Sequence, residues 1–211
     1  PSGAPLTRLR GPGSNTTKVA EMTKDKTVME KDFLAPGGPV EIYTDYYFAK
    51  PAAASGTDVG EVVSKQMFGG SPIAFFLYDP ATESFHWGAN KGDKDGQIMP
   101  GSWVNLHAVI EPDTSKATLA EQWANSELTL TVGDTTVTRT LNVAYNEAIW
   151  DIANYDKDST KRGAKLAYEY YHPNATGSIY LDNVLVQRHG VPDPTPSPTP
   201  GPTLEPIPTP Q

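Results

Sequence analysis

Residues 40–49, VEIYTDYYFA, decide the fold class that this chain predicts. Two kinds of side chain alternate along the stretch: Val40, Ile42, Thr44, Tyr46 and Phe48 share one face, and Glu41, Tyr43, Asp45 and Tyr47 share the other. A period of two is the pattern of a β-strand, because successive side chains point to opposite sides. We therefore predict a strand with one face packed against a core and a polar second face.

The same pattern recurs on both sides of this stretch. Residues 103–111, WVNLHAVIE, alternate in the same way, and residues 73–78 form a more continuous apolar run, typical of a deeply buried strand. Alternating aliphatic residues flank Gly133-Asp134, which predicts a hairpin with a type II′ turn. Further strands are expected at residues 17–22, 26–33, 84–88, 165–172 and 178–187.

Helical patterns are scarce, since residues 118–126 and 146–155 would each make a turn or two between strands. Short strands separated by clusters of Gly, Pro, Asn and Asp predict an all-β domain. The expected architecture is an antiparallel β-sandwich of the jelly-roll kind.

The composition disfavours some classes of function and excludes others. The chain has 211 residues, with 17 Lys+Arg against 25 Asp+Glu, a net charge of −8, and no cysteine. An acidic balance disfavours a nucleic-acid partner, because phosphate binding needs a clustered cationic face. No apolar run approaches the roughly 20 residues of a membrane span. The absence of cysteine excludes thiolate metal sites, thiol nucleophiles and disulfide scaffolds.

The composition changes near Gly190. Residues 192–210, PDPTPSPTPGPTLEPIPTP, alternate proline with small polar residues, which favours extended polyproline II and excludes helix or inner strand. We predict a β-sandwich domain over residues 1–190 and a Pro/Thr-rich linker over 191–211 that leads to a further module. The chain begins at Pro1 rather than methionine, which we interpret as a processed, secreted chain without its signal peptide.

Evidence for catalysis is thin. Glu41 and Asp45 are the paired acids that a strand would place on one face, as glycoside hydrolysis requires, although a solvated acidic edge gives the same pattern. The sequence has no Gly-x-Ser-x-Gly elbow, zinc-binding helix or glycine-rich phosphate loop, and its histidines lack metal-ligand spacing.

Sugar binding has more support, because sugars present apolar C–H faces fringed by hydroxyls and are met by aromatic rings beside polar side chains. The predicted polar strand face also carries Tyr43, Trp103, Asp45 and Glu169, beside several of the candidate binding residues. Each ring could equally be a core residue. The candidate binding residues are Tyr47, Trp87, Asn105, His107, Trp123, Trp150, Tyr155 and Tyr171.

Asp182 is the candidate metal ligand. In SIYLDNVLV the apolar phase shifts at Asp182-Asn183, which predicts a β-bulge, a place where a strand can re-aim a side chain. The carboxylate there would be hydrogen-bonded locally or help to hold one structural cation.

Several motifs carry a family resemblance. In order they are VMEKDF, VEIYTDYYF, SPIAFFLYDPATESFHWG, GSWVNLHAVIEPDTSKATL and GSIYLDNVLVQR, and together they resemble the concanavalin A-like lectin/glucanase superfamily. Galactose-binding-type sandwich modules end in a similar strand. The resemblance implies a jelly roll in which Asp182 occupies the place of an aspartate that often ligates structural calcium.

The chain departs from the catalytic branches of that superfamily. It lacks the Glu-x-Asp-x-x-Glu strand of laminarinase-like hydrolases and the Arg-x-Glu-Leu-Arg strand of alginate-lyase-like members. The Pro-Thr linker is similar to those of secreted bacterial plant-cell-wall enzymes. These features favour a non-catalytic carbohydrate-binding module that targets a linked module to a polysaccharide. The alternatives are a polysaccharide lyase or glycoside hydrolase of the same fold, and a cell-surface adhesion domain.

Overall fold

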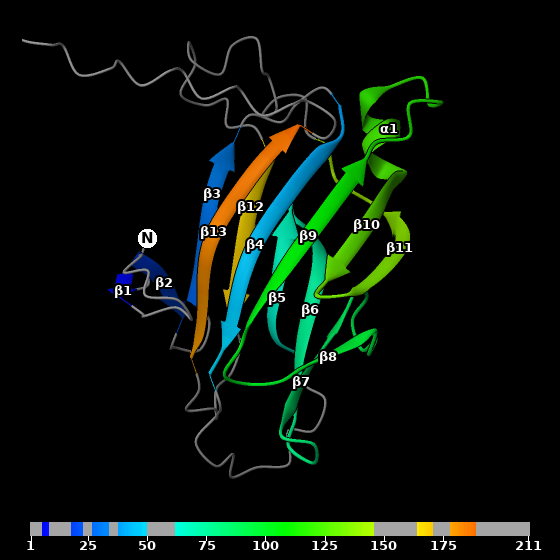
Figure 1. Ribbon diagram of the computed structural model, residues 1–211. Coiled ribbons are helices and arrows are strands. Elements are labelled where there is room, and N and C mark those ends of the chain that lie inside the picture. The colour runs from blue at the N-terminus through cyan, green and yellow to red at the C-terminus, as the bar shows by residue number, and fades with distance from the viewer. Residues whose placement is uncertain are drawn as a thin grey trace, which may run out of the picture.

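Two antiparallel sheets form the sandwich in the computed structural model, which describes residues 6–8, 18–22, 27–33, 38–49, 62–145, 164–170 and 178–188. The front sheet, nearer the viewer in Figure 1, has the strand order β1-β2-β13-β4-β9-β10-β11. The back sheet has the order β3-β12-β5-β6-β7-β8. The front strands are β1 (Leu6–Arg8), β2 (Lys18–Met22), β13 (Ile179–Arg188), β4 (Val40–Phe48), β9 (Trp103–Glu111), β10 (Ser126–Val132) and β11 (Thr135–Leu141). The back strands are β3 (Thr27–Phe33), β12 (Ala164–Tyr170), β5 (Val62–Phe68), β6 (Ser71–Asp79), β7 (Ser84–Gly88) and β8 (Gly96–Ile98).

The predicted all-β sandwich is confirmed in the described residues, and most predicted strands lie within a residue or two of their observed bounds. Sequence reasoning missed β1, β5 and β8. In β5, VVSKQMF, polar Ser64 and Gln66 occupy inward positions and are fully buried, which breaks the apolar alternation. The predicted linker, residues 191–211, lies outside the described residues.

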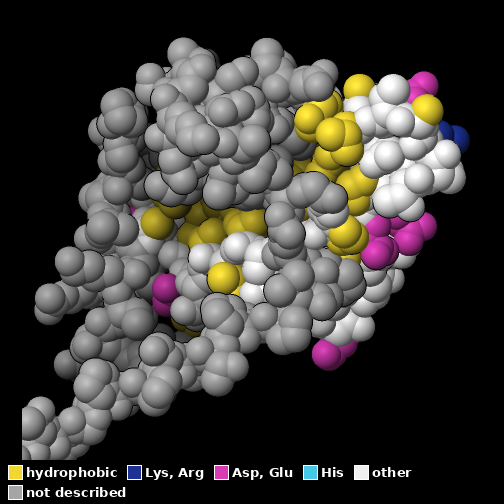
Figure 2. All heavy atoms as spheres, turned by 90° about the horizontal axis from the view of Figure 1, so that it is seen from above, with side chains coloured by type: hydrophobic (Ala, Val, Ile, Leu, Met, Phe, Trp, Pro, Cys, Tyr) yellow, Lys and Arg dark blue, Asp and Glu magenta, His cyan; other side chains and the backbone are white. Residues whose placement is uncertain are grey.

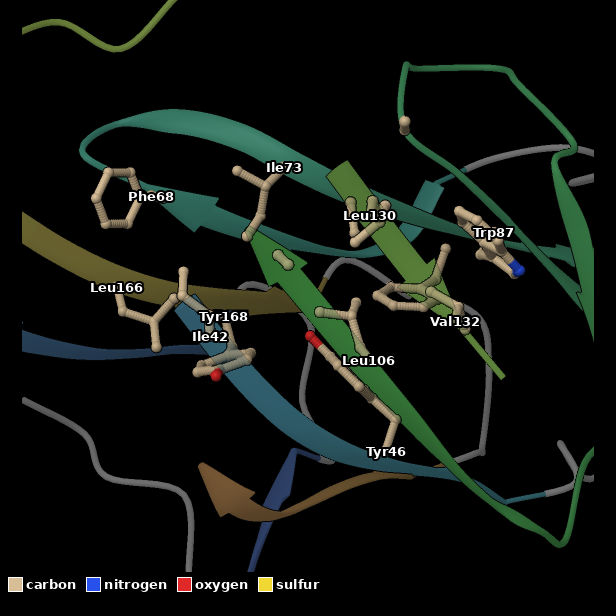
Figure 3. Packing of buried hydrophobic residues seen from close by; sticks show 14 of the residues in the cluster. Ile42, Tyr46, Phe68, Ile73, Trp87, Leu106, Leu130, Val132, Leu166 and Tyr168 are labelled. Carbon is tan, nitrogen blue, oxygen red and sulfur yellow. The ribbon is translucent and has the colours of Figure 1, made fainter. Parts of the chain in front are cut away.

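The core lies between the sheets. Ile42 and Tyr46 of β4 and Leu106 of β9 belong to the same buried cluster as Leu166 and Tyr168 of β12 in the opposite sheet (Figure 3). Seen from above, hydrophobic side chains are visible near the centre of the view, and most of the visible acidic side chains lie toward one edge (Figure 2). Every second residue of β4 is buried here, so the alternation predicted for residues 40–49 sets the inner and outer faces.

Two tyrosines bring hydroxyl groups into this core. The Tyr46 hydroxyl donates to Gln66 Oε1 at 2.9 Å, and the Tyr168 hydroxyl shares a 2.7 Å hydrogen bond with Thr44 Oγ1. Burial raises the pKa of both phenols, which therefore stay neutral. These pairs satisfy polar atoms that would otherwise be buried at a cost.

Local signals explain the turns. The β10–β11 hairpin turns at Gly133, whose φ of 57° is followed by a residue without positive φ, as a type II′ turn requires. Helix α1 (Leu119–Ala124) begins with a capping box, in which Thr118 and Glu121 each bond the other's backbone N–H. Thus the sequence-predicted hairpin and the helical excursion at residues 118–126 are both confirmed.

Two tryptophans predicted as solvent-facing platforms are core residues, so that expectation is wrong for both. Trp87 is 1% exposed and Trp123 is 2% exposed. Trp87 follows inward-facing Phe85 by two residues, and it pairs with Gly96 of β8, where any Cβ would collide with the indole nitrogen. The glycine therefore leaves room for the ring to be buried.

Trp123 is buried for a different reason. It is the buried residue of the short helix α1, and its ring lies 5.8 Å from that of Phe68. A two-turn helix at the end of a sandwich can bury little apolar surface, so its largest side chain anchors it to the core. The polar neighbours Gln122 and Asn125 face outward, which is why the local sequence suggested exposure.

Candidate functional site

The candidate site is the outer face of the front sheet, which faces the viewer in Figure 1. Strand pairing aligns its residues in rows that run across β13, β4 and β9. One row holds Gln187, Glu41 and Val109, the next Leu185, Tyr43 and His107, the third Asp182, Asp45 and Asn105, and the fourth Tyr180, Tyr47 and Trp103. Residues far apart in the sequence thus form one continuous surface.

Glu41 is the centre of a hydrogen-bonded cluster in the first two rows. Tyr43 donates its hydroxyl to Glu41 Oε1 at 2.6 Å, His107 Nε2 bonds the same oxygen at 2.7 Å, and Gln187 Nε2 donates to Oε2 at 3.1 Å. The Tyr43 and His107 rings stack with centroids 4.3 Å apart and an angle of 3° between planes. The carboxylate therefore fixes both rings in place.

The cluster keeps Glu41 ionised. Partial burial alone would raise its pKa, but the hydrogen bonds from Tyr43, Gln187 and His107, with the charge of protonated His107, outweigh this and lower the pKa to about 2. Since an ionised carboxylate only accepts hydrogen bonds, His107 Nε2 carries the proton in its bond to Glu41. Glu41 is thus an orienting group and is poorly suited to act as a general acid.

Asp45 is held between two amides in the third row. Asn105 Nδ2 donates to Asp45 Oδ1 at 2.9 Å, and Asn183 Nδ2 donates to Asp45 Oδ2 at 2.7 Å. Asn183 reaches this position because β13 has a bulge between Asp182 and Leu185, where Asn183 adopts a φ of 49°. The bulge predicted at Asp182-Asn183 is confirmed.

Aromatic side chains form the fourth row. The Tyr47 ring lies 5.5 Å from that of Trp103 and 5.8 Å from that of Tyr180, between centroids. All three side chains are half-buried, so their neighbours hold them while part of each ring faces solvent. The row offers an apolar surface of fixed shape beside the polar third row.

The structure brings together some of the predicted site residues. Tyr47, Asn105 and His107 lie on this outer face, whereas Trp87 and Trp123 lie in the core. Trp150, Tyr155 and Tyr171 lie outside the described residues. The predicted grouping of Glu169 with this face is wrong, because β12 belongs to the back sheet and Glu169 pairs with Lys65 there at 2.8 Å.

The members of this surface that sequence reasoning missed include Tyr180, Asn183 and Gln187. These three are on β13, where Tyr180 precedes Asp182 by two residues and so shares its face up to the bulge. That alternation was a usable signal for Tyr180. The place of Gln187 depends on the register after the bulge, which only the structure supplies.

The calcium ion expected at Asp182 stays a prediction. Asp182 Oδ1 accepts the backbone N–H of Asn183 at 2.8 Å, and its cross-strand neighbour Asp45 has an amide donor on each oxygen. Within the described ranges, no group of three or more His, Cys, Asp or Glu residues is arranged to hold a metal ion.

A pocket of about 350 Å³ adjoins the fourth row at one end of the sandwich. Its lining includes Trp103 of the outer face and, from the interior, Trp87, Ile98 and Val132. Met99, which is largely exposed, borders it. The pocket is thus continuous with the aromatic row through Trp103.

No family model matches the sequence, and no curated protein matches it. No helix among the described residues is long and apolar enough to span a membrane.

Comparison with solved structures finds shared architecture at low identity. An endo-β-1,4-glucuronan lyase from the fungus Trichoderma reesei is 9% identical, with 87% of each chain covered and a TM-score of 0.51. Alginate lyase Aly36B is 14% identical over 85% of this chain and 84% of that one, with a TM-score of 0.45. The cellulose-induced protein Cip1 is 10% identical over 89% and 88%, with a TM-score of 0.44. The likeness to the glucuronan lyase shows a common fold, consistent with the concanavalin A-like sandwich that the sequence motifs resemble.

Proposed function

We propose that this protein binds a polysaccharide on the outer face of the front sheet without cleaving it. The proposal is carried by one observation: the aromatic row of Tyr47, Trp103 and Tyr180 lies directly beside the polar row of Asp45 and Asn105. Flat rings next to hydrogen-bonding side chains are the chemistry that recognises a sugar. In a secreted chain, the segment 191–211 would link this module to another one and so bring that module to its substrate.

Glycoside hydrolysis fits the face poorly. A hydrolase needs one carboxyl group that stays protonated to donate a proton to the leaving oxygen. Glu41 has its pKa lowered to about 2, and each oxygen of Asp45 accepts an amide N–H. Glu41 and Asp45 therefore hold neighbouring side chains in place and are poorly suited to act as a catalytic acid pair.

A second candidate is a polysaccharide lyase, favoured by the stacked Tyr43 and His107. In β-elimination a base removes the proton beside the uronate carboxyl group, and an acid protonates the departing glycosidic oxygen. The fold neighbour with a TM-score of 0.51 is described as a glucuronan lyase. Against this candidate, both side chains bond the ionised Glu41, and Asp45 lies in the next row, so a substrate carboxylate would meet repulsion.

The test is retention of the full chain on insoluble cellulose, xylan, mannan and pectin, with parallel assays for reducing sugar and unsaturated product. We expect retention on at least one polysaccharide with no turnover. The double variant Tyr47→Ala with Trp103→Ala should weaken retention about tenfold or more. A tenfold loss corresponds to roughly 1.4 kcal/mol of binding free energy.

The matched control is Phe75→Ala, which removes a half-buried aromatic ring from the outer side of the back sheet. It should leave retention unchanged. Unsaturated product from the wild type would establish the lyase instead, and no retention on any polysaccharide would reject the binding proposal.

A further inference from the structure

The third row of the outer face holds an amide–carboxylate–amide bridge, Asn105–Asp45–Asn183. Each asparagine gives one side-chain N–H to a different oxygen of Asp45, at 2.9 and 2.7 Å. Both asparagines are exposed. A charged acceptor makes such hydrogen bonds stronger than neutral ones, so Asp45 fixes the orientation of both amides.

The bridge depends on the bulge in β13. Leu181 and Asp182 pair with Tyr46 and Asp45 in regular register, and pairing resumes only at Leu185 with Tyr43. The extra residue lets Asn183, at a φ of 49°, reach over Asp45. Asparagine tolerates this left-handed conformation better than most residues, so position 183 suits both the backbone and the amide contact.

The held amides keep hydrogen-bonding capacity for a ligand. In the part of the chain that the structure describes, the side-chain carbonyl oxygens of Asn105 and Asn183 have no protein partner, and neither has the second N–H of either amide. The bridge therefore presents two donors and two acceptors in fixed positions. Sugar hydroxyls both donate and accept, and prior fixation of the protein groups lowers the entropy cost of binding.

Rings lie on both sides of the bridge. Along β4 and β9 the preceding row holds stacked Tyr43 and His107, and the following row holds Tyr47 and Trp103. Rows on one face of a strand are about 6.6 Å apart, so each aromatic row is within reach of a ligand held at Asp45.

The charge of the face limits the kind of sugar. Its described side chains include Glu21, Glu41, Asp45, Asp182, Glu111 and Glu127, and none of them is Lys or Arg. An anionic sugar would approach these carboxylates with no Lys or Arg on the described part of the face to pair with, which costs free energy at short range.

We infer that the Asn105–Asp45–Asn183 bridge is a subsite for the hydroxyl groups of an uncharged sugar, and that the face selects neutral polysaccharides over polyuronates. This inference rests on the proposed binding function. It adds the class of substrate and the residues that would bind it.

The experiment measures binding isotherms of the full chain on xylan, mannan and cellulose, and on glucuronan and polygalacturonate as charged probes. Asn183→Gly keeps the left-handed backbone available and removes only the amide. Asn105→Ala removes the opposite amide from a regular, exposed strand position. Each variant should bind the neutral polysaccharide about 3- to 10-fold more weakly, as expected for one or two lost hydrogen bonds.

Phe75→Ala, on the outer side of the back sheet, is again the control and should bind as the wild type does. Thermal unfolding shows whether each variant is folded, and Asn105→Ala still tests the subsite if Asn183→Gly loosens the bulge. Unchanged affinity in both bridge variants, while Tyr47→Ala with Trp103→Ala loses binding, overturns the subsite and leaves the proposed function standing. Preference of the wild type for glucuronan or polygalacturonate overturns the neutral class.

Discussion

Strand β4 carries tyrosines on both faces, and the phenol groups on the two faces differ in burial and in their contacts. On the inner face, Tyr46 is fully buried and bonds Gln66, itself a core residue. On the outer face, Tyr43 bonds the ionised Glu41, and Tyr47 contacts other rings while part of it meets solvent. The inner face thus uses polar groups to complete a core, whereas the outer face uses them to hold neighbouring side chains in fixed positions.

The largest expected effect comes from comparing the loss of a core tryptophan, Trp87 of the back sheet, with the loss of a surface tryptophan, Trp103 of the front sheet. Trp87→Ala should lower the free energy of unfolding by about 3–5 kcal/mol, because it opens a cavity in the core. Trp103→Ala, half-buried on the outer face, should cost less than half as much and weaken glycan retention instead. Urea unfolding measures both. Equal losses of stability would contradict the assignment of Trp103 to the surface.

The next effect concerns the pH dependence of stability. The pKa of Glu41 is lowered from 4.5 to about 2 in the folded protein, so ionised Glu41 stabilises the fold. This contribution is complete above pH 4.5 and is lost as the pH falls through 2, and it amounts to at most about 3 kcal/mol. Urea unfolding at pH 6 and pH 2.5 measures it.

Glu41→Gln should destabilise the protein at pH 6 and flatten this part of the pH profile. Glu127→Gln, on the same outer face but outside the Glu41 cluster, should keep the profile of the wild type. A wild-type profile in Glu41→Gln would mean that the cluster does not hold the ionised form.

The smallest effect separates the two tyrosine environments. Tyr46→Phe leaves Gln66 Oε1 without its donor in the core, where Gln66 Nε2 already lacks a partner among the described residues, and should cost about 1–3 kcal/mol. Tyr43→Phe should cost less, because water can replace the hydroxyl at a half-buried site. It should also raise the pKa of Glu41, which NMR titration of the carboxyl group detects. A similar shift in Tyr46→Phe would be unexpected.

Much of the outer face followed from alternation alone. Residues 40–49 and 103–111 placed Tyr47, Asn105 and His107 on one polar face, and the phase shift at Asp182 located the bulge. These inferences succeeded because the side-chain period of a strand is fixed by covalent geometry. They failed for Trp87 and Trp123, whose exposure depends on what packs above them rather than on their neighbours in the chain.

Sequence by itself determined the fold class, the strand faces and the hairpin at Gly133, since these follow from local patterns of period two and from turn chemistry. Tertiary structure decided which strands lie side by side. Only the pairing of β13 with β4, and of β4 with β9, brings Gln187, Glu41 and His107 into one cluster and Asn183 to Asp45. Such contacts join residues up to 146 positions apart, and their register depends on the packing of the whole sandwich.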